Sequence, residues 1–150
     1  MRSSRTIQTV EISTIAHATD DLDKVQTVLT RLIPDTLKGR QLFTRRYIQG
    51  HYGNPIVTFE ARLTKPSEID EFATFFLSQL SNRDKLAIQR DLRLHSDAEG
   101  NLYVRIDKQQ TFRGIVQLGE EDPIRVRMKF TMFTGKATDL MVKYLESEQN

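Results

Sequence analysis

The 150-residue chain contains no cysteine. This absence excludes disulfides, thiolate metal sites and cysteine nucleophiles together. Long apolar runs are also missing, because the longest are far shorter than the roughly 18 residues that a membrane span needs. Residues 1–5 lead into a polar, strand-like stretch instead of the apolar segment of a signal peptide. We therefore expect a cytoplasmic protein with no membrane partner.

Neither sign of charge is in large excess, since 22 basic and 20 acidic residues leave a net charge of +2. The charge is nevertheless spread unevenly: residues 35–65 carry +4 and residues 102–130 carry +2, whereas residues 66–101 carry −3. The planar guanidinium of arginine suits bidentate contacts with phosphate. Two interpretations stay open at this point, an ordinary solvated surface and a face for an anionic partner.

Hydrophobic periodicity indicates the elements of secondary structure. The sequence predicts strands over 7–16, 40–49, 56–63, 102–106, 115–118 and 124–130, and helices over 20–33, 67–80, 82–93 and 136–147. Ser67 and Ser81 each begin a pattern typical of a helix N-terminus. Because the strands alternate apolar and polar residues, we expect an antiparallel sheet with helices packed on one face. The predicted fold is therefore α+β, in one domain covering 1–150.

Three short motifs distinguish this sequence from a generic α+β chain. They are HATDD at 17–21, GHYGNPI at 50–56, and EGNLYVRIDKQ at 99–109, which is followed by Arg113-Gly114. Together they resemble archaeal RNA-binding proteins described as predicted exosome subunits. The resemblance implies a fold similar to a double-stranded-RNA-binding domain and to a ribosomal protein that grips a small rRNA. It also implies homodimers, with RNA and either the exosome or other RNA-processing proteins as partners.

One predicted strand has a basic outer side. Arg125, Arg127 and Lys129 alternate along it and project from the same face. Together with Arg105, Lys108 and Arg113 they would form a surface that holds RNA by its phosphates. Arg40, Arg45 and Arg46, near the second strand, would extend this surface. The alternative is the solvent side of an ordinary sheet, with Asp107 and Glu60 pairing these basic groups.

The loop between the second and third strands is a further candidate. It contains two glycines, a proline and an asparagine, which favour turns and close approach of a partner. His51, Tyr52 and Asn54 would contact bases or phosphates there. The alternative is a turn kept for its shape. The loop lacks the Gly-Lys-Ser/Thr ending of a nucleotide-binding loop.

No pattern in the sequence indicates catalysis. The histidines at 17, 51 and 95 show no metal-ligand spacing, and no cofactor fingerprint or nucleophile motif occurs. We therefore expect a non-catalytic RNA-binding protein, without metal or cofactor, that assists RNA processing or the exosome. The alternative is a dimeric module that docks on a larger assembly without touching RNA; Phe75, which lies off the main helix stripe, is the candidate subunit contact. A nuclease would need a carboxylate or histidine cluster.

Overall fold

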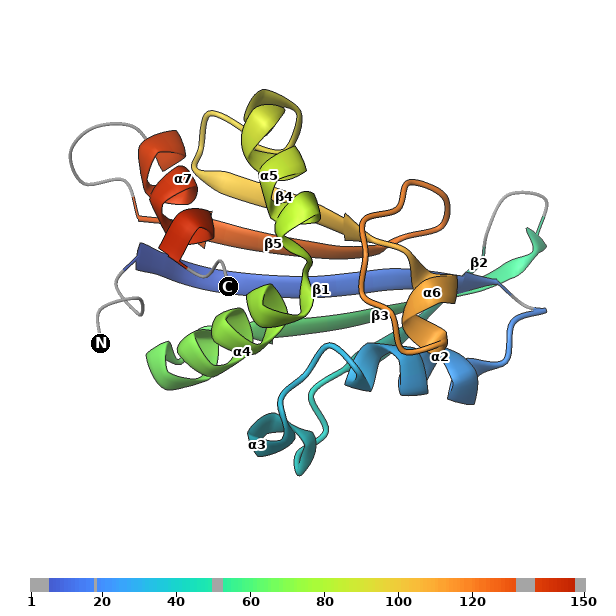
Figure 1. Ribbon diagram of the computed structural model, residues 1–150. Coiled ribbons are helices and arrows are strands. Elements are labelled where there is room, and N and C mark those ends of the chain that lie inside the picture. The colour runs from blue at the N-terminus through green and yellow to red at the C-terminus, as the bar shows by residue number, and fades with distance from the viewer. Residues whose placement is uncertain (1–5, 18, 50–52, 132–136, 148–150) are drawn as a thin grey trace.

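A computed structural model describes residues 6–17, 19–49, 53–131 and 137–147. Its centre is a five-stranded antiparallel sheet with the strand order β2-β3-β1-β5-β4. The strands are β1 (Ile7–His17), β2 (Thr44–Gln49), β3 (Pro55–Leu63), β4 (Asn101–Ile106) and β5 (Ile124–Phe130). The long β1 occupies the middle of the sheet, so residues far apart in the sequence become neighbours across it (Figure 1).

The helices pack on one face of this sheet (Figure 1). They are α2 (Leu22–Thr30), α3 (Asp35–Lys38), α4 (Pro66–Gln79), α5 (Asn82–Arg90), α6 (Lys108–Phe112) and α7 (Ala137–Ser147), with a short 3₁₀ turn, η2, at Leu92–Leu94. The predicted α+β fold, an antiparallel sheet covered on one side, is confirmed. None of the helices in the described ranges is long and apolar enough to cross a membrane.

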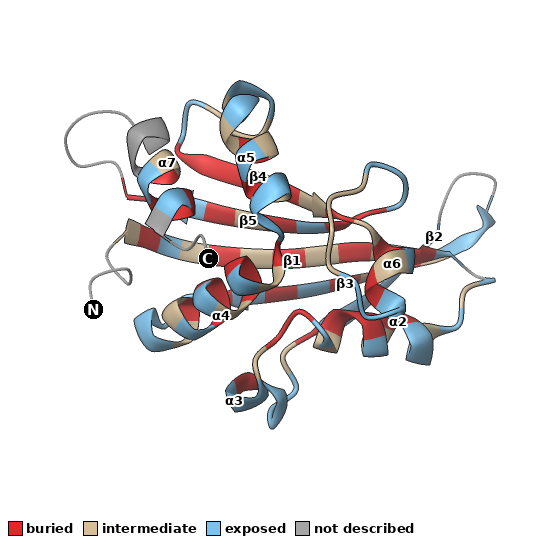
Figure 2. Ribbon diagram, in the orientation of Figure 1, coloured by how far each residue is buried: buried red, intermediate tan, exposed pale blue. Residues whose placement is uncertain are grey.

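The core lies between the sheet and the helices. Every second residue of the strands points into it, as Val57, Phe59 and Leu63 do in β3, and these side chains are buried (Figure 2). The stripe of α4 meets them, with Phe72 and Phe76 stacked at 5.4 Å between ring centroids. The other face of the sheet therefore carries the alternate, polar residues.

Several boundaries differ from the sequence prediction. Ser67 is not the cap of α4, because Lys65 occupies that position and Pro66 begins the helix, where its missing N–H costs nothing. Ser81 does cap α5, and its hydroxyl accepts a hydrogen bond from the backbone N–H of Asp84 at 3.0 Å. The helix predicted over 20–33 ends at Thr30, and the short α3 follows Pro34.

The predicted strand over 115–118 is wrong. Only an isolated bridge, Ile106 to Leu118, forms in this segment. The chain first makes the short helix α6, which periodicity did not reveal, because the Asp107 side chain accepts a hydrogen bond from the backbone N–H of Gln110 and caps it. It then returns as a loop across the end of β4, where the N–H of Gly119 bonds the carbonyl of Arg105 at 3.1 Å.

Candidate functional site

The polar side of the sheet, facing away from the helices, is the main candidate, and we call it the open face. Antiparallel register places directly opposed residues on the same side of a sheet, so the face can be followed strand by strand. Its charged residues are the cations Arg46, Arg62, Arg105, Arg125, Arg127 and Lys129 and the carboxylates Glu11 and Glu60. The excess of four positive charges makes the open face suitable for an anionic ligand.

Two arginines stand directly opposite each other at one end of this face. The register of β4 and β5 pairs Arg105 with Arg125, and β1 contributes Ser13 as the next neighbour of Arg125. Neither guanidinium meets a carboxylate or another hydrogen-bonding side chain within the described part of the chain. Like charges at directly opposed positions destabilise a sheet. The folded protein therefore carries a cost here that an anion could remove.

The neighbouring row of the open face is neutralised internally. Glu11 of β1 accepts from Arg62 of β3 at 3.2 Å and from Arg127 of β5 at 2.6 Å. These contacts differ from the alternative considered from the sequence, in which Glu60 and Asp107 would pair with the basic groups. Glu11 is separated from Arg127 by most of the chain, so only the strand order brings them together.

A hydrogen-bonded chain extends this row to the edge of the sheet. The hydroxyl of Tyr103, which stands opposite Arg127 in the register of β4 and β5, donates to Asp97 at 2.8 Å. Partial burial alone would raise the pKa of Asp97, but hydrogen bonds from Asn101, Tyr103 and Glu99 outweigh it and lower the pKa to about 2. The hydrogen bond to Asp97 in turn raises the pKa of Tyr103. Arg127 thus lies between Glu11, with which it pairs, and Tyr103, which is fixed by Asp97.

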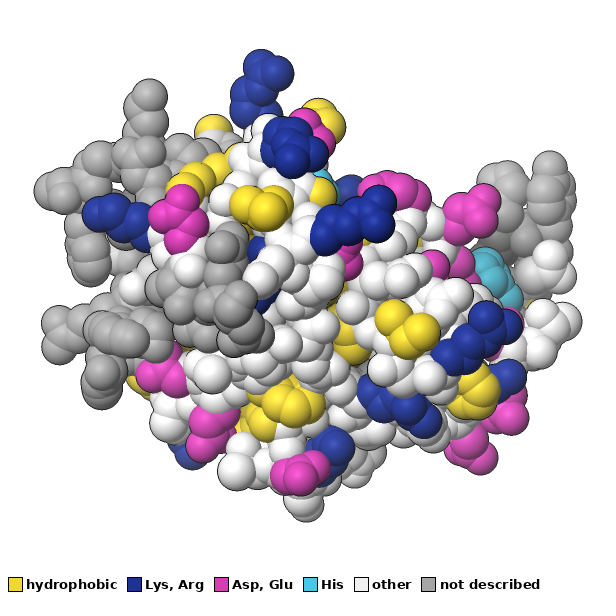
Figure 3. Space-filling model, in the orientation of Figure 1, with side chains coloured by type: hydrophobic (Ala, Val, Ile, Leu, Met, Phe, Trp, Pro, Cys, Tyr) yellow, Lys and Arg dark blue, Asp and Glu magenta, His cyan; other side chains and the backbone are white. Residues whose placement is uncertain are grey.

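The opposite side of the molecule has a different charge pattern. Figure 3 shows Lys, Arg, Asp and Glu side chains mixed over the helices, without a continuous patch of one sign. Arg40, expected to extend the basic surface, is paired there with Glu68 at 2.7 Å. Arg45 points to the helix side of β2, where its guanidinium lies 5.0 Å from the ring centre of buried Phe59. Of the three arginines near the second strand, only Arg46 belongs to the open face.

Lys108 and Arg113 do not lie on the open face with the other predicted residues. They belong to α6 and its C-terminal end, on the helix side of the sheet. The Lys108 ammonium is buried, and it donates to the carbonyl of Ile15 at 2.8 Å and to Asp122 at 2.9 Å. A buried, paired ammonium cannot reach a phosphate without breaking both bonds, so we leave Lys108 out of the candidate surface. Arg113 is exposed at the C-terminal end of α6.

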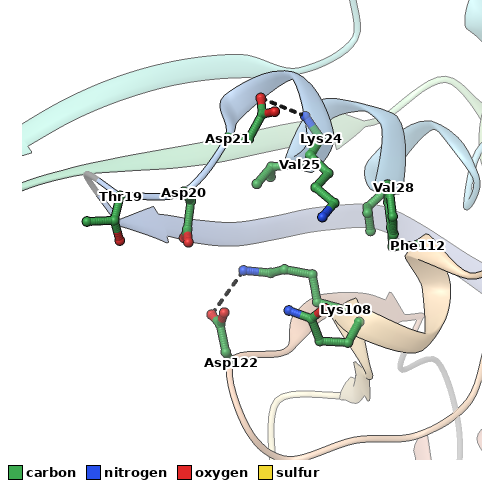
Figure 4. Close-up of a pocket in the computed structure, with 10 residues that line it drawn as sticks. Thr19, Asp20, Asp21, Lys24, Val25, Val28, Lys108, Phe112 and Asp122 are labelled. Atoms are coloured by element: carbon green, nitrogen blue, oxygen red, sulfur yellow. Dashed lines mark hydrogen bonds and ion pairs between the residues drawn. The ribbon is translucent and has the colours of Figure 1, made fainter.

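Lys108 forms the floor of a pocket between α2, α6 and the loop before β5 (Figure 4). The pocket, of about 320 Å³, brings together parts of the first and third sequence motifs. Its carboxylates are already used: Asp21 accepts from the backbone N–H groups of Asp23 and Lys24, and Asp20 accepts from that of His17. The Lys24 ammonium lies 4.4 Å from the ring centre of Phe112. These contacts hold α2 and α6 on β1, which is a structural role.

The described residues contain no group of three His, Asp or Glu side chains placed to hold a metal ion. In the loop after β2, His51 and Tyr52 lie outside the described residues. Asn54 is exposed at the start of β3, and the side chain of Gln49 donates to the carbonyl of Gly53 at 3.1 Å to close the turn. Gly53 has φ of +78°, a conformation that favours glycine.

Sequence reasoning missed Glu11, Tyr103 and Tyr47. Tyr47 is 66% exposed on the edge strand β2. The signal for Tyr47 was its place beside Arg45 and Arg46, which together make a basic-aromatic triplet. Nothing local marked Glu11 or Tyr103, because their partners come from other strands. Phe75 is half-buried on α4, and its role as a subunit contact stays a prediction.

Known proteins share both the sequence and the fold. A family model described as RNA binding matches residues 9–130. The RNA-binding protein PAB1135 of Pyrococcus abyssi is 32% identical over 129 residues, which are 85% of this chain and 84% of that protein. An uncharacterized protein of Methanocaldococcus jannaschii, MJ0213, is 27% identical over 95% of this chain and 97% of its own length.

Two crystal structures share the fold of this chain. Protein AF2318 from Archaeglobus fulgidus, of the DUF54 family, is 30% identical with a TM-score of 0.78, over 95% of this chain and 99% of that one. Protein SSO0741 from Sulfolobus solfataricus, also of DUF54, has a TM-score of 0.75 at 24% identity, over 93% and 98% of the two chains, and so shows the fold alone. The family match covers both strands of the opposed arginine pair and the three sequence motifs. This chain therefore belongs to that family of archaeal RNA-binding proteins.

Proposed function

We propose that this protein binds RNA through the open face, by its phosphates and without catalysis. The observation that carries the proposal is the opposed pair Arg105 and Arg125, which has no carboxylate partner among the described residues. An RNA phosphate between the two guanidinium groups would satisfy the donors of both and remove their mutual repulsion. The family match and the RNA-binding relative support an RNA ligand over other polyanions.

Binding of this kind depends on charge and shape more than on base sequence. The ladder Arg125, Arg127 and Lys129 places a cation on the open face about every 7 Å, at every second residue of one strand. Glu11 already neutralises part of this ladder, so Arg105, Arg125 and Lys129 contribute most of the available charge. We also propose the sequence-predicted residues Asn54, His51 and Tyr52 as further contacts; of these only Asn54 lies within the described residues.

A salt-dependence experiment tests the proposal. Fluorescence anisotropy of a labelled single-stranded RNA, titrated at several salt concentrations, should give a logarithmic slope near −0.7 for each neutralised phosphate. Replacing both Arg105 and Arg125 with Ala should reduce the magnitude of that slope by about 0.7, because the two share one phosphate, and should weaken binding. The matched control replaces Arg83 and Arg90, which are exposed on α5, and should bind as the wild type does. Equal weakening in the control would contradict the proposal.

The rival function is a protein-docking module that does not contact RNA. Such a module would show no RNA binding even at low salt, and its affinity for a protein partner would change little with ionic strength. A nuclease would be revealed by cleavage of labelled RNA in the presence of Mg²⁺. The first result would contradict the proposed RNA binding, and the second would contradict the proposed absence of catalysis.

The resemblance supports a finer proposal about the setting. We infer that the protein acts as a cytoplasmic homodimer and assists the exosome or other RNA-processing proteins. Sedimentation of the purified protein over a range of concentrations tests the dimer. Copurification of exosome subunits with this protein from a nuclease-treated lysate tests the partner. If the subunits copurify only from an untreated lysate, RNA alone links them to this protein.

A further inference from the structure

The edge strand β2 has features that the open-face proposal does not use. All six of its residues, Thr44 to Gln49, are exposed (Figure 2). It pairs only with β3, and its outer edge has no partner strand within the described residues. An exposed strand edge normally carries charge or is covered, because unpaired backbone groups invite another chain.

Tyr47 is the most exposed aromatic side chain in the described ranges, at 66%. It pairs with Val57 across the ladder and therefore points to the helix side of the sheet, along with Arg45. Arg46, between them, points to the open face. β2 thus carries a cation on each side of the sheet, and the Tyr47 ring lies beside Arg45 on the helix side.

The charge of this hairpin identifies the kind of ligand. From Thr44 to Phe59 the described residues include Arg45 and Arg46 but no acidic residue. Aromatic rings beside cationic side chains are the usual platform for unpaired bases, since every base has a face that can stack. A duplex has no free base faces at its sides, so this platform would serve single-stranded RNA only.

The position of β2 fits a continuous path for one RNA strand. Three strand spacings, about 14 Å in total, separate β5 from β2. A strand whose phosphates contact the arginines of β5 would reach Arg46 and then turn over the sheet edge, bringing the next base to Tyr47. The ring would end the path at the edge of the sheet.

Pairing of β2 with a second copy is the competing explanation for an open edge. A two-fold antiparallel pair of β2 strands would bring the arginines of both copies together on one short ladder. Like charges that close destabilise such a pair, and charge at an edge is a common means of preventing it. Charge therefore favours an anionic ligand over a second copy.

We propose that Tyr47 is a stacking platform for an unpaired RNA base and that it gives the protein a preference for single-stranded over double-stranded RNA. The inference rests on the proposed RNA-binding function and adds the class of RNA to it. It also identifies a contact that uses no phosphate. Loss of Tyr47 should thus change affinity without changing the salt dependence.

Two measurements test the inference. In the first, Tyr47→Ala and Tyr47→Phe are titrated with a single-stranded RNA and with a blunt duplex of the same length. We expect Tyr47→Ala to bind the single strand roughly ten- to a hundredfold more weakly, with an unchanged salt slope and unchanged duplex affinity. Tyr47→Phe, which keeps the ring, should bind as the wild type does. Leu94→Ala, at a residue of η2 that is 77% exposed, is the control for a change at an exposed site.

The second measurement uses the absence of tryptophan from the chain. Tyr47→Trp introduces a single fluorophore, which a stacked base should quench; Leu94→Trp is the control and should keep its emission. The inference would be overturned, and the proposed function left intact, if the wild type binds RNA, Tyr47→Ala binds it equally well, and RNA does not quench the emission of Tyr47→Trp. Absence of wild-type binding at low salt would overturn both. A change in Tyr47→Trp emission with protein concentration, without RNA, would show that β2 pairs with a second copy and overturn the inference alone.

Discussion

Arginine and lysine at neighbouring sequence positions serve different purposes in this molecule. Lys108 follows Arg105 by three residues, yet the chain has entered α6 by then and its ammonium is buried against β1. Its bond to Asp122 fixes the loop before β5, where Asp122 adopts a φ of +45°. A positive charge in a basic stretch is thus no guarantee of an external ligand, because the backbone path decides which side of the sheet it reaches.

Glu11 limits the charge of the open face, so its removal should strengthen RNA binding. Glu11→Gln frees Arg62 and Arg127 from their shared carboxylate and removes one negative charge close to the bound phosphates. A charge about 6 Å away in a watery environment changes affinity about threefold, so tighter binding by that factor is expected.

The same change should affect folding little. Both ion pairs are partly exposed, and pairs of this kind contribute about 1 kcal/mol or less to the free energy of unfolding. RNA titration and urea denaturation of Glu11→Gln measure the two effects. Glu60→Gln is the useful comparison, because Glu60 lies on the same face and no ion pair involves it in the described part of the molecule. Weaker RNA binding by Glu11→Gln would mean that Glu11 serves mainly to position Arg127.

At the scale of elements, the turn before β4 depends on one carboxylate. Asp97 accepts from the backbone N–H groups of Glu99 and Asn101, each at 3.0 Å, and from the side chains of Asn101 and Tyr103. Its four donors lower the pKa of Asp97 to about 2 despite partial burial. The carboxylate form is therefore the form that the folded turn stabilises.

Asp97 should make the stability of the protein depend on pH in acid solution. A carboxyl group whose pKa is lowered by folding stabilises the folded state above its ordinary pKa, and this contribution is lost as the pH falls through the lowered value. Asp97→Asn should be about 1–2 kcal/mol less stable than the wild type at pH 7. The difference should shrink between pH 4 and pH 2, as urea denaturation at several pH values would reveal. A constant difference over this range would show that Asp97 acts through its shape alone.

Gly119 explains why the segment after α6 is a loop that crosses β4. A Cβ atom at Gly119 would lie 2.7 Å from the Cβ and 2.8 Å from the Cα of Asp107, the residue that caps α6. Gly119→Ala should therefore destabilise the protein by about 1–3 kcal/mol, the usual cost of overpacking.

Gly39→Ala is the matched control for Gly119→Ala, because no atom lies within 4 Å of its added Cβ and its φ of −72° suits alanine. Its stability should equal or slightly exceed that of the wild type. Thermal melting of both variants measures the difference. A melting temperature for Gly119→Ala equal to that of Gly39→Ala would mean that the loop can move away from α6.

The elements that could be predicted are those with long periodic patterns. The alternation in β5 and the stripe of α4 each extend over several repeats, and both are confirmed by burial. The short segments gave no such signal: α6 has five residues, and four partly apolar residues at 115–118 imitate a strand. For the site, Arg125, Arg127 and Lys129 could be placed on one face because their spacing alone determines it.

The remaining site features depend on contacts between distant segments. The opposition of Arg105 and Arg125 requires the register of β4 against β5, and the 17-residue connection between them includes a helix and a loop rather than a short turn of known geometry. The contacts of Glu11 with Arg62 and Arg127 likewise require the register of β1 against both of its neighbouring strands. Such pairs cannot be derived from local patterns, whereas composition did indicate which stretches were basic.

For the whole molecule, the position of charge should matter more than its total. The net charge of +2 is small, yet six cations and two carboxylates occupy the open face. A double variant separates the two quantities: Arg125→Gln removes a cation from the open face, and Thr74→Arg adds one at an exposed position of α4, on the helix side. The net charge stays at +2.

At physiological salt, charges are screened beyond about 8 Å, so the added arginine should not attract RNA to the opposite side of the sheet. We expect the double variant to bind RNA as weakly as Arg125→Gln alone at 0.15 M salt, and somewhat more strongly than it at 0.01 M, where screening extends to about 30 Å. Recovery of wild-type affinity at physiological salt would mean that RNA responds to the overall charge and that the open face is not the binding surface.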